Sequence, residues 1–201
     1  MALPTSAMAA LQLIAVDGVA ATPWRNGGGV TRELLAWPSA QAWQLRISVA
    51  NIDADGPFSD FPGVDRWFAV VQGHGVALRF ADQTLQLNAQ SAPAQFEAER
   101  TPHCSLTDGA TRDLNLMSRR DAGSARMLRA VAGEVWQSSA PFRALFCSAP
   151  VRLQVDGADA GNLPAWTLAF SADARHQRWC AWPLGETLQA WWMEFSPLPP
   201  I

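Results

Sequence analysis

The sequence contains no lysine and no tyrosine among its 201 residues. All fifteen basic residues are therefore arginine, and eighteen acidic residues bring the formal net charge to −3. A chain without lysine cannot build a Walker A phosphate loop, a lysine Schiff base or a serine–lysine hydrolase dyad. The missing lysine thus excludes several classes of enzyme at once.

Charged residues are also scarce, at 16% of the chain against 49% hydrophobic residues, which excludes a disordered tail and a coiled coil. The arginines are scattered apart from a run at 119–129. We interpret that run as a solvated connecting segment, so we expect no nucleic-acid partner. No apolar run approaches the length of a membrane span, and the N-terminus lacks the basic region of a signal peptide. We therefore expect a cytoplasmic protein that does not bind a membrane.

Cysteine and histidine are few, with three of each. Cys104, Cys147 and Cys180 lie far apart without a CxxC pair, which indicates free thiols in a reducing compartment. The histidines lack the spacing of a metal-binding pair, and no GxSxG motif is present. We expect no metal and no cofactor.

What the sequence does have is the two-residue periodicity of β-strands, and no long segment keeps the repeat of a helix. Short runs separated by Gly, Pro and Asp-Gly predict an all-β fold, either a sandwich or a barrel. Two small barrels and one continuous double sheet are equally compatible with this pattern, and no sequence repeat relates the two halves. Strands are predicted at 43–50, 67–71, 76–80, 84–87, 103–107, 111–117, 134–137, 142–147, 151–155, 166–170 and 187–195.

Ten tryptophans are present, and large rings most commonly fill β-barrel cores. Adjacent residues of a strand point to opposite faces. We therefore expect at least one of Trp191 and Trp192 to lie at an outer face or a contact. A homodimer formed there is one interpretation.

Two loop motifs can carry chemistry. Residues 23–33 read Pro-Trp-Arg-Asn-Gly-Gly-Gly-Val-Thr-Arg-Glu. Three glycines allow either a close approach to a ligand or a tight connection before a strand, and the connection is the commoner use. Residues 55–66 form a compact loop that leads to Asp65 and Arg66. Arg66 either presents its guanidinium to a carboxylate ligand or pairs with Asp65 or Asp60.

Two predicted strands carry the other motifs. In the strand 43–50, the polar Arg46 and Ser48 point either to solvent or into a polar cavity, and the sequence does not decide between them. In residues 112–120, alternation puts Arg112, Leu114 and Leu116 on a largely core face. The opposite face, which suits a pocket lining, carries Asp113, Asn115 and Met117.

These four segments, in this order, resemble the HutD/Ves family. Arg25 stands where the family usually has lysine, Leu114 replaces a phenylalanine, and residues 96–99 lack the expected Gly/Asp pattern. The resemblance implies a cupin-like bicupin, two fused β-barrels of the double-stranded β-helix type. Residues 1–120 would form the barrel with the candidate pocket, and residues 121–201 a structural barrel.

The resemblance also implies a protein that modulates histidine utilization by binding a small carboxylate metabolite, such as N-formylglutamate or urocanate. In this sequence arginine would supply the bidentate carboxylate contact, and an amide and a hydroxyl the orienting hydrogen bonds. The implied ligand-binding residues are Trp24, Asn26, Arg46, Ser48, Arg66, Asn115 and Met117.

Two other functions remain open. A metal-independent isomerase or hydrolase acting on such a metabolite would need a titratable acid–base residue, for which the candidates are Asp113, Asp65 and Glu33. A protein-interaction module would need no small ligand.

Overall fold

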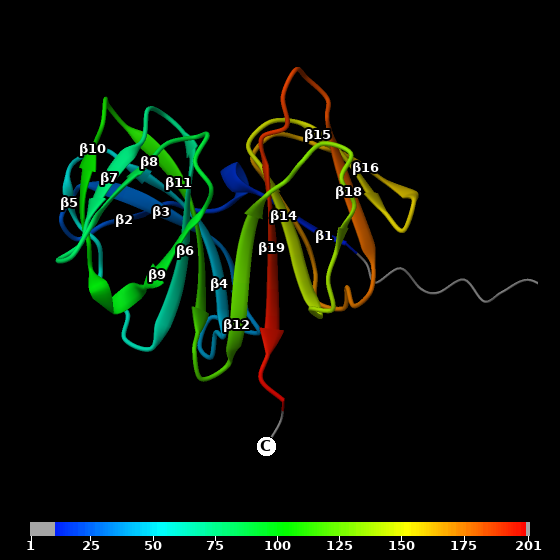
Figure 1. Ribbon diagram of the computed structural model, residues 1–201, viewed down its shortest axis with the longest axis horizontal. Helices are drawn as coiled ribbons and strands as arrows, with labels where there is room; N and C mark the ends of the chain where they lie inside the picture. The colour runs from blue at the N-terminus through cyan, green and yellow to red at the C-terminus, as the bar shows by residue number, and fades with distance from the viewer. Residues whose placement is uncertain (1–10, 200–201) are drawn as a thin grey trace, which may run out of the picture.

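The computed structural model describes residues 11–199 and consists almost entirely of β-strands (Figure 1). Within this range the only helical elements are two short 3₁₀ turns, η1 (Val16–Gly18) and η2 (Ala98–Arg100). The predicted all-β fold is confirmed. Every strand predicted from the sequence overlaps an observed strand.

The strands between residues 22 and 119 form one barrel, on the left in Figure 1. Their bounds are β2 (Thr22–Pro23), β3 (Gly29–Trp37), β4 (Leu45–Ile52), β5 (Gly56–Pro57), β6 (Val64–Gln72), β7 (Val76–Arg79), β8 (Thr84–Leu87), β9 (Ala94–Glu97), β10 (His103–Leu106) and β11 (Thr111–Arg119). A six-stranded sheet, β2-β3-β4-β11-β6-β9, faces a four-stranded sheet, β5-β10-β7-β8. Buried side chains from both sheets, including Phe68 and Leu78, fill the space between them.

The remaining strands form a second barrel. Their bounds are β1 (Gln12–Ala15), β12 (Gly123–Arg129), β13 (Trp136–Gln137), β14 (Phe142–Cys147), β15 (Val151–Val155), β16 (Ala158–Leu163), β17 (Thr167–Ser171), β18 (Arg178–Pro183) and β19 (Ala190–Pro197). The larger sheet has the order β1-β17-β14-β19-β12 and the smaller one β13-β18-β15-β16. The interior between them is largely apolar and includes Leu145, Leu153 and Trp179.

The two barrels repeat one strand arrangement, offset by eight strands. The run β4-β11-β6-β9 corresponds to β12-β19-β14-β17, and β5-β10-β7-β8 corresponds to β13-β18-β15-β16. Strand pairing therefore reveals a repeat that the sequence does not show. The cupin-like, two-barrel fold is confirmed.

Strand β1 departs from this arrangement. Although it lies near the N-terminus, it pairs antiparallel with β17, Gln12 opposite Phe170, and so joins a sheet of the second barrel. The division of the chain at residue 120 stays a prediction, and residues 1–10 lie outside the described range.

The larger sheets of the two barrels pack on each other. Ile47 and Leu116 from the first barrel meet Phe146 and Trp191 from the second in one apolar cluster. Face-to-face packing of this kind buries the outer face of each sheet. Both faces of each larger sheet are therefore covered, one by the interior of its own barrel and one by the other barrel.

This double coverage determines where the paired tryptophans lie. Trp191 is 0% exposed and Trp192 is 3% exposed, so neither ring faces solvent, and the expected contact of one of them is the contact between the two barrels of this chain. Trp191 enters the core between the barrels, and Trp192 enters the interior of the second barrel. The homodimer stays a prediction, and these residues do not support it.

The arginine run at 119–129 is a solvated connection only in part. Residues 120–122 link β11 to β12, and Arg119, Arg120 and Arg126 are exposed, as the interpretation from sequence expects. The interpretation is wrong for 123–129, which form β12, because a strand that carries several arginines lacks the usual apolar alternation. Nε of Arg126 lies 3.1 Å from Oε1 of Glu194, and Cζ of Arg129 lies 5.3 Å from the ring centre of Trp191.

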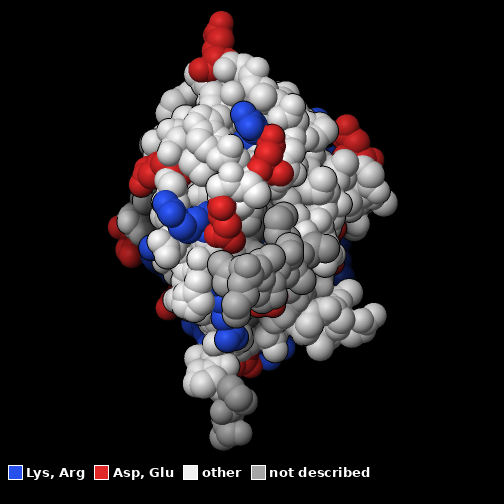
Figure 2. Space-filling view, turned by 90° about the vertical axis from the view of Figure 1, so that its right-hand side faces the viewer, with Lys and Arg blue, Asp and Glu red and all other residues white. Residues whose placement is uncertain are grey.

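The surface is sparsely charged. On the face shown in Figure 2, arginine and acidic side chains are few, and they lie scattered among uncharged residues. No helix in the part of the chain that the structure describes is long and apolar enough to cross a membrane.

Candidate functional site

The interior of the first barrel holds a polar cluster on three neighbouring strands. Arg46 on β4, Met117 on β11 and Arg66 on β6 lie opposite one another in one row. Ser48 and Asn115 lie opposite each other two positions along the same strands. Opposed residues of antiparallel strands share a face, so these five predicted residues face the same interior. Ser48 is 3% exposed, which places it in the interior rather than in solvent.

Arg66 is the buried cation of this cluster. It is 7% exposed, and within residues 11–199 its Nε has no hydrogen-bond partner. Burial lowers the pKa of Arg66 to about 10; the charge of Asp113 opposes this shift and that of Arg46 adds to it. Its Cζ atom lies near three ring centres: Phe58 at 5.1 Å, Phe61 at 5.5 Å and Phe96 at 6.0 Å.

Arg46 approaches the same place. Its Cζ lies 5.9 Å from the ring centre of Phe61, so two guanidinium groups flank one ring. Nε of Arg46 lies 2.6 Å from Oε2 of Glu33, an ion pair that lacks the alignment of a hydrogen bond. Two like charges brought together in a largely buried place are costly unless an anion compensates them.

Asp113 adds a carboxyl group to this interior. It is 1% exposed, and its Oδ2 accepts a hydrogen bond from Nδ2 of Asn115. Oδ1 of Asp113 and Oδ1 of Asn115 are both buried, with no partner among the described residues. Burial raises the pKa of Asp113 to about 7, and the charge of Arg66 and the bond from Asn115 oppose this shift. Asp113 therefore changes charge near neutral pH.

Trp24 and Asn26 lie on the glycine loop and not on the three central strands. Nε1 of Trp24 donates to Oγ1 of Thr31 over 2.8 Å, and the ring packs at the edge of the interior apolar cluster. Asn26 is exposed, and its Oδ1 accepts a hydrogen bond from the backbone N–H of Gly28.

The glycines of this loop serve a close strand connection. A Cβ at Gly29 would lie 2.1 Å from the backbone oxygen of Asn51, so no side chain fits there. The carbonyl oxygen of Gly28 accepts hydrogen bonds from the backbone of Asp53 and Ala54. The structure therefore favours the tight connection over an anion cradle.

The other two acid–base candidates differ from Asp113. Oδ1 of Asp65 lies 3.0 Å from Nη1 of Arg120, so Asp65 pairs with Arg120 and not with Arg66, which was one of the alternatives that the sequence leaves open. Glu33 is partly exposed and pairs with Arg46. The predicted site does not include the rings of Phe58, Phe61 and Phe96, although Phe58 and Phe61 lie in the motif 55–66.

The donor set does not fit a metal ion. Guanidinium groups cannot coordinate metal, and the remaining donors of the polar cluster are a hydroxyl, an amide and one carboxyl. Between residues 11 and 199, no three or more His, Cys, Asp or Glu side chains stand together in a group that could hold a metal.

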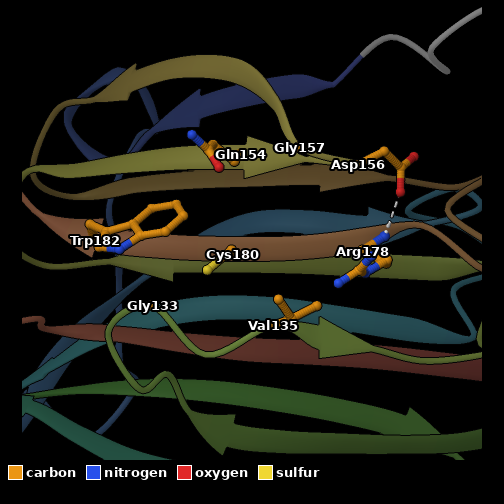
Figure 3. Close-up of a pocket in the computed structure, with 8 residues that line it drawn as sticks. All are labelled: Gly133, Val135, Gln154, Asp156, Gly157, Arg178, Cys180 and Trp182. Carbon is orange, nitrogen blue, oxygen red and sulfur yellow. Dashed lines mark hydrogen bonds between the residues drawn. The ribbon is translucent and has the colours of Figure 1, made fainter.

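Two surface hollows lie elsewhere. One, of about 280 Å³, lies on the outer face of the sheet that contains β15 and β18 (Figure 3). Gln154, Cys180 and Trp182 line it, and Oδ1 of Asp156 accepts a hydrogen bond from the backbone N–H of Arg178 over 2.7 Å. The other, of about 220 Å³, is lined by Asn51, Asp53, Gln72, Ala110, Thr111 and Arg112. Neither contains a residue of the predicted ligand site.

The paired sheets and the arginine-lined interior define a cupin-like protein of two barrels. Among solved structures, this chain is similar to a conserved protein of unknown function from Pseudomonas aeruginosa PAO1, with a TM-score of 0.83 at 27% identity. That match covers 94% of this chain and 100% of the other. HutD from Pseudomonas fluorescens SBW25, described with a formate condition, has a TM-score of 0.82 at 23% identity and the same coverage. A mutant of oxalate decarboxylase from Bacillus subtilis shares only the fold, with a TM-score of 0.60 at 8% identity over 94% of this chain and 78% of that one.

The sequence model of the HutD family matches residues 17–178. The chain belongs to the HutD family. Among curated relatives, Protein Ves of Citrobacter koseri is 35% identical over 106 residues, 52% of this chain and 56% of that protein. An uncharacterized 21.2 kDa protein in the hutC 3′ region of Pseudomonas putida is 34% identical over 112 residues, 55% of this chain and 59% of that protein. The matched part therefore spans little more than half the length of these relatives.

Proposed function

We propose that this protein binds a small carboxylate metabolite inside its first barrel and thereby modulates histidine utilization in the cytoplasm. The observation that carries the proposal is the convergence of Arg46 and Arg66 on Phe61, where, among residues 11–199, a carboxylate lies in ion-pair contact with Arg46 and none with Arg66. A ligand carboxylate between the two guanidiniums would accept charge-assisted hydrogen bonds and compensate both charges.

The other predicted residues would orient this ligand. Asn115 and Ser48 would supply hydrogen bonds from the next row, and Met117 would provide an apolar contact between the two arginines. Trp24 and Asn26 would close the mouth of the barrel from the glycine loop. Oδ1 of Asn115 and Oδ1 of Asp113 are buried and have no partner among the described residues. A ligand with an N–H or O–H group beside its carboxylate would donate a hydrogen bond to these oxygens while its carboxylate contacts the arginines.

The link to histidine utilization rests on the family and on the Pseudomonas putida relative, which is described by its place in the hutC 3′ region. N-formylglutamate and urocanate are the first ligands to test, since both carry a carboxylate. Thermal unfolding with a panel of histidine-pathway intermediates would identify the ligand. A concentration of about 100 times the dissociation constant adds roughly 2.7 kcal/mol of stability.

Substitution of the arginines tests the site. We expect Arg66→Ala and Arg46→Ala each to weaken binding by roughly 2–5 kcal/mol in calorimetric titration, because a buried charged hydrogen bond is lost. Arg152→Ala is the matched control, since Arg152 pairs with the exposed Asp159 on the second barrel and should leave the affinity unchanged. Wild-type affinity in Arg66→Ala would refute the assignment.

The buried Asp113 supports a second candidate, a metal-independent isomerase or hydrolase acting on such a metabolite. A carboxyl group with a pKa of about 7 can both accept and donate a proton near neutral pH. Turnover of the bound metabolite followed by NMR would establish this activity, and Asp113→Asn should abolish turnover while retaining binding. Binding without turnover would exclude this second candidate and would favour a protein that only binds the carboxylate.

A further inference from the structure

The second barrel repeats the arginine row of the first. In the first barrel, one interior row runs Arg46, Met117, Arg66 and Phe96 across β4, β11, β6 and β9. In the second barrel, a row runs Arg126, Glu194, Arg143 and Ser171 across the corresponding strands β12, β19, β14 and β17. In each barrel the two arginines therefore lie on the two strands that flank a central strand, β11 in the first barrel and β19 in the second.

The two rows differ at the central residue. Between its arginines the first barrel has the uncharged Met117, and the second barrel has the carboxylate of Glu194. Both central residues face the interior of their barrel, since each is two residues along its strand from another interior side chain, Asn115 or Trp192.

Glu194 supplies the anion that its row requires. Its Oε1 lies 3.1 Å from Nε of Arg126. Arg143 on the other side is 0% exposed and lies with its Cζ 5.1 Å from the ring centre of Trp136. Burial lowers the pKa of Arg143, and the charge of Glu194 opposes this shift. The carboxylate therefore pairs with the half-exposed Arg126, and its charge acts on the buried Arg143 across the row without a direct ion pair among the described residues.

Because the two rows correspond, the position of Glu194 in the second barrel indicates the position of a bound carboxylate in the first. We infer that a bound carboxylate lies between Arg46 and Arg66, against Met117, and so performs the role that the side chain of Glu194 performs between Arg126 and Arg143. The second barrel then carries a closed version of the same site, occupied by the chain itself. This inference rests on the proposed function, which puts the anion between Arg46 and Arg66, and adds why only one of the two barrels binds it.

A carboxylate placed at the central position of the first barrel tests the inference. Met117→Glu should fill the site from within, whereas Met117→Gln has almost the same shape without the charge. With sodium acetate as the probe, and sodium chloride of equal ionic strength as the reference, wild type should bind acetate, and Met117→Gln measures how far the change of shape alone weakens that binding. Met117→Glu should bind acetate roughly 100-fold more weakly than Met117→Gln, because like charges compete for one place. Acetate binding by Met117→Glu at wild-type strength would overturn the inference and leave the proposed function intact.

Substitution of Glu194 in the second barrel gives an independent test that does not depend on the folding of Met117→Glu. In an Arg66→Ala background, which removes the first site, Glu194→Ala removes the carboxylate and the volume that it fills, and should produce a rise in unfolding temperature with acetate that Arg66→Ala alone lacks. No acetate-dependent rise would show that the second row is not a closed anion site. If wild type binds no carboxylate of the panel while the double variant responds to acetate, the proposed function fails and the equivalence of the two rows stands.

Discussion

Replacing Asp113 with asparagine should change how the stability of the protein depends on pH. Asp113 is fully buried, and its pKa rises from an ordinary value of 3.8 to about 7 in the folded chain. Burial causes the shift, because it penalises the charged carboxylate more than the charge of Arg66 and the bond from Asn115 stabilise it. Asparagine has nearly the same shape and does not ionise.

The size and sign of the effect follow from proton linkage. Between about pH 4 and pH 7 the folded protein keeps the proton on Asp113, whereas the unfolded chain has lost it. The unfolded state then binds fewer protons, so the free energy of unfolding falls as the pH rises. The stabilisation is fully present below about pH 4 and is lost as the pH rises through about 7. A rise of the pKa of Asp113 from 3.8 to about 7 corresponds to roughly 4 kcal/mol of stability.

Urea denaturation of both proteins across this range measures the effect. The free energy of unfolding of wild type, minus that of Asp113→Asn, should decrease by roughly 4 kcal/mol between about pH 4 and pH 8 and level off above the folded pKa. Other titrating groups are common to both proteins and cancel in the difference. A difference that stays constant over this range would refute the reasoning, because Asp113 would then titrate alike in the folded and unfolded chains.

Two further substitutions test the packing that positions the site. Gly29→Ala should destabilise the protein by roughly 1–3 kcal/mol in urea denaturation, because its Cβ would meet the backbone of Asn51 at 2.1 Å. Gly18→Ala, with open space at the Cβ position, should change stability by no more than about 0.5 kcal/mol; equal losses in both would contradict the close-approach argument. Trp191→Ala should cost roughly 3–5 kcal/mol of stability, since the ring is fully buried in the core between the barrels, and a loss below about 1 kcal/mol would contradict that role.

The site was predictable where strand alternation alone decides which way a side chain points. Alternation along 112–120 separates Asp113 and Asn115 from Leu114, and the structure has them on opposite faces, all buried. For Arg46 and Ser48 the same rule allows solvent or cavity, because both accept polar side chains. Only the smaller sheet, which closes the barrel over that face, decides between them.

Tertiary packing decides what alternation leaves open at the other strands. Alternation correctly puts Trp191 and Trp192 on opposite faces of their strand. The sequence does not show that the first barrel covers the outer face of this sheet, on which Trp191 lies. Strand β12 is missed because arginines occupy several of its positions, and their partners, such as Glu194, are distant in sequence. Phe96 lies in the short strand β9, whose contribution to the site depends on its pairing with Arg66.

The repeat of two barrels escapes the sequence because equivalent strands need only similar faces and not similar residues. At the central position of the arginine rows, the first barrel has Met117 and the second has Glu194. Two barrels with the same strand arrangement therefore have different interiors. The second interior holds the carboxylate of Glu194 and is lined mainly by aliphatic side chains together with Trp136, Trp179 and Trp192. In the first interior, Arg66, Asn115 and Asp113 each have a buried polar atom without a hydrogen-bond partner among the described residues.

The use of arginine at position 66 has a physical reason. Burial lowers the pKa of Arg66 to about 10, so the group stays charged at neutral pH. Lysine begins near 10.4, and the same shift would bring it to about 8, close to losing its charge. A lysine also lacks the planar group that lies against the ring of Phe61 and the fork that matches a carboxylate. In this interior an arginine therefore keeps its positive charge at neutral pH, whereas a lysine would be close to losing it.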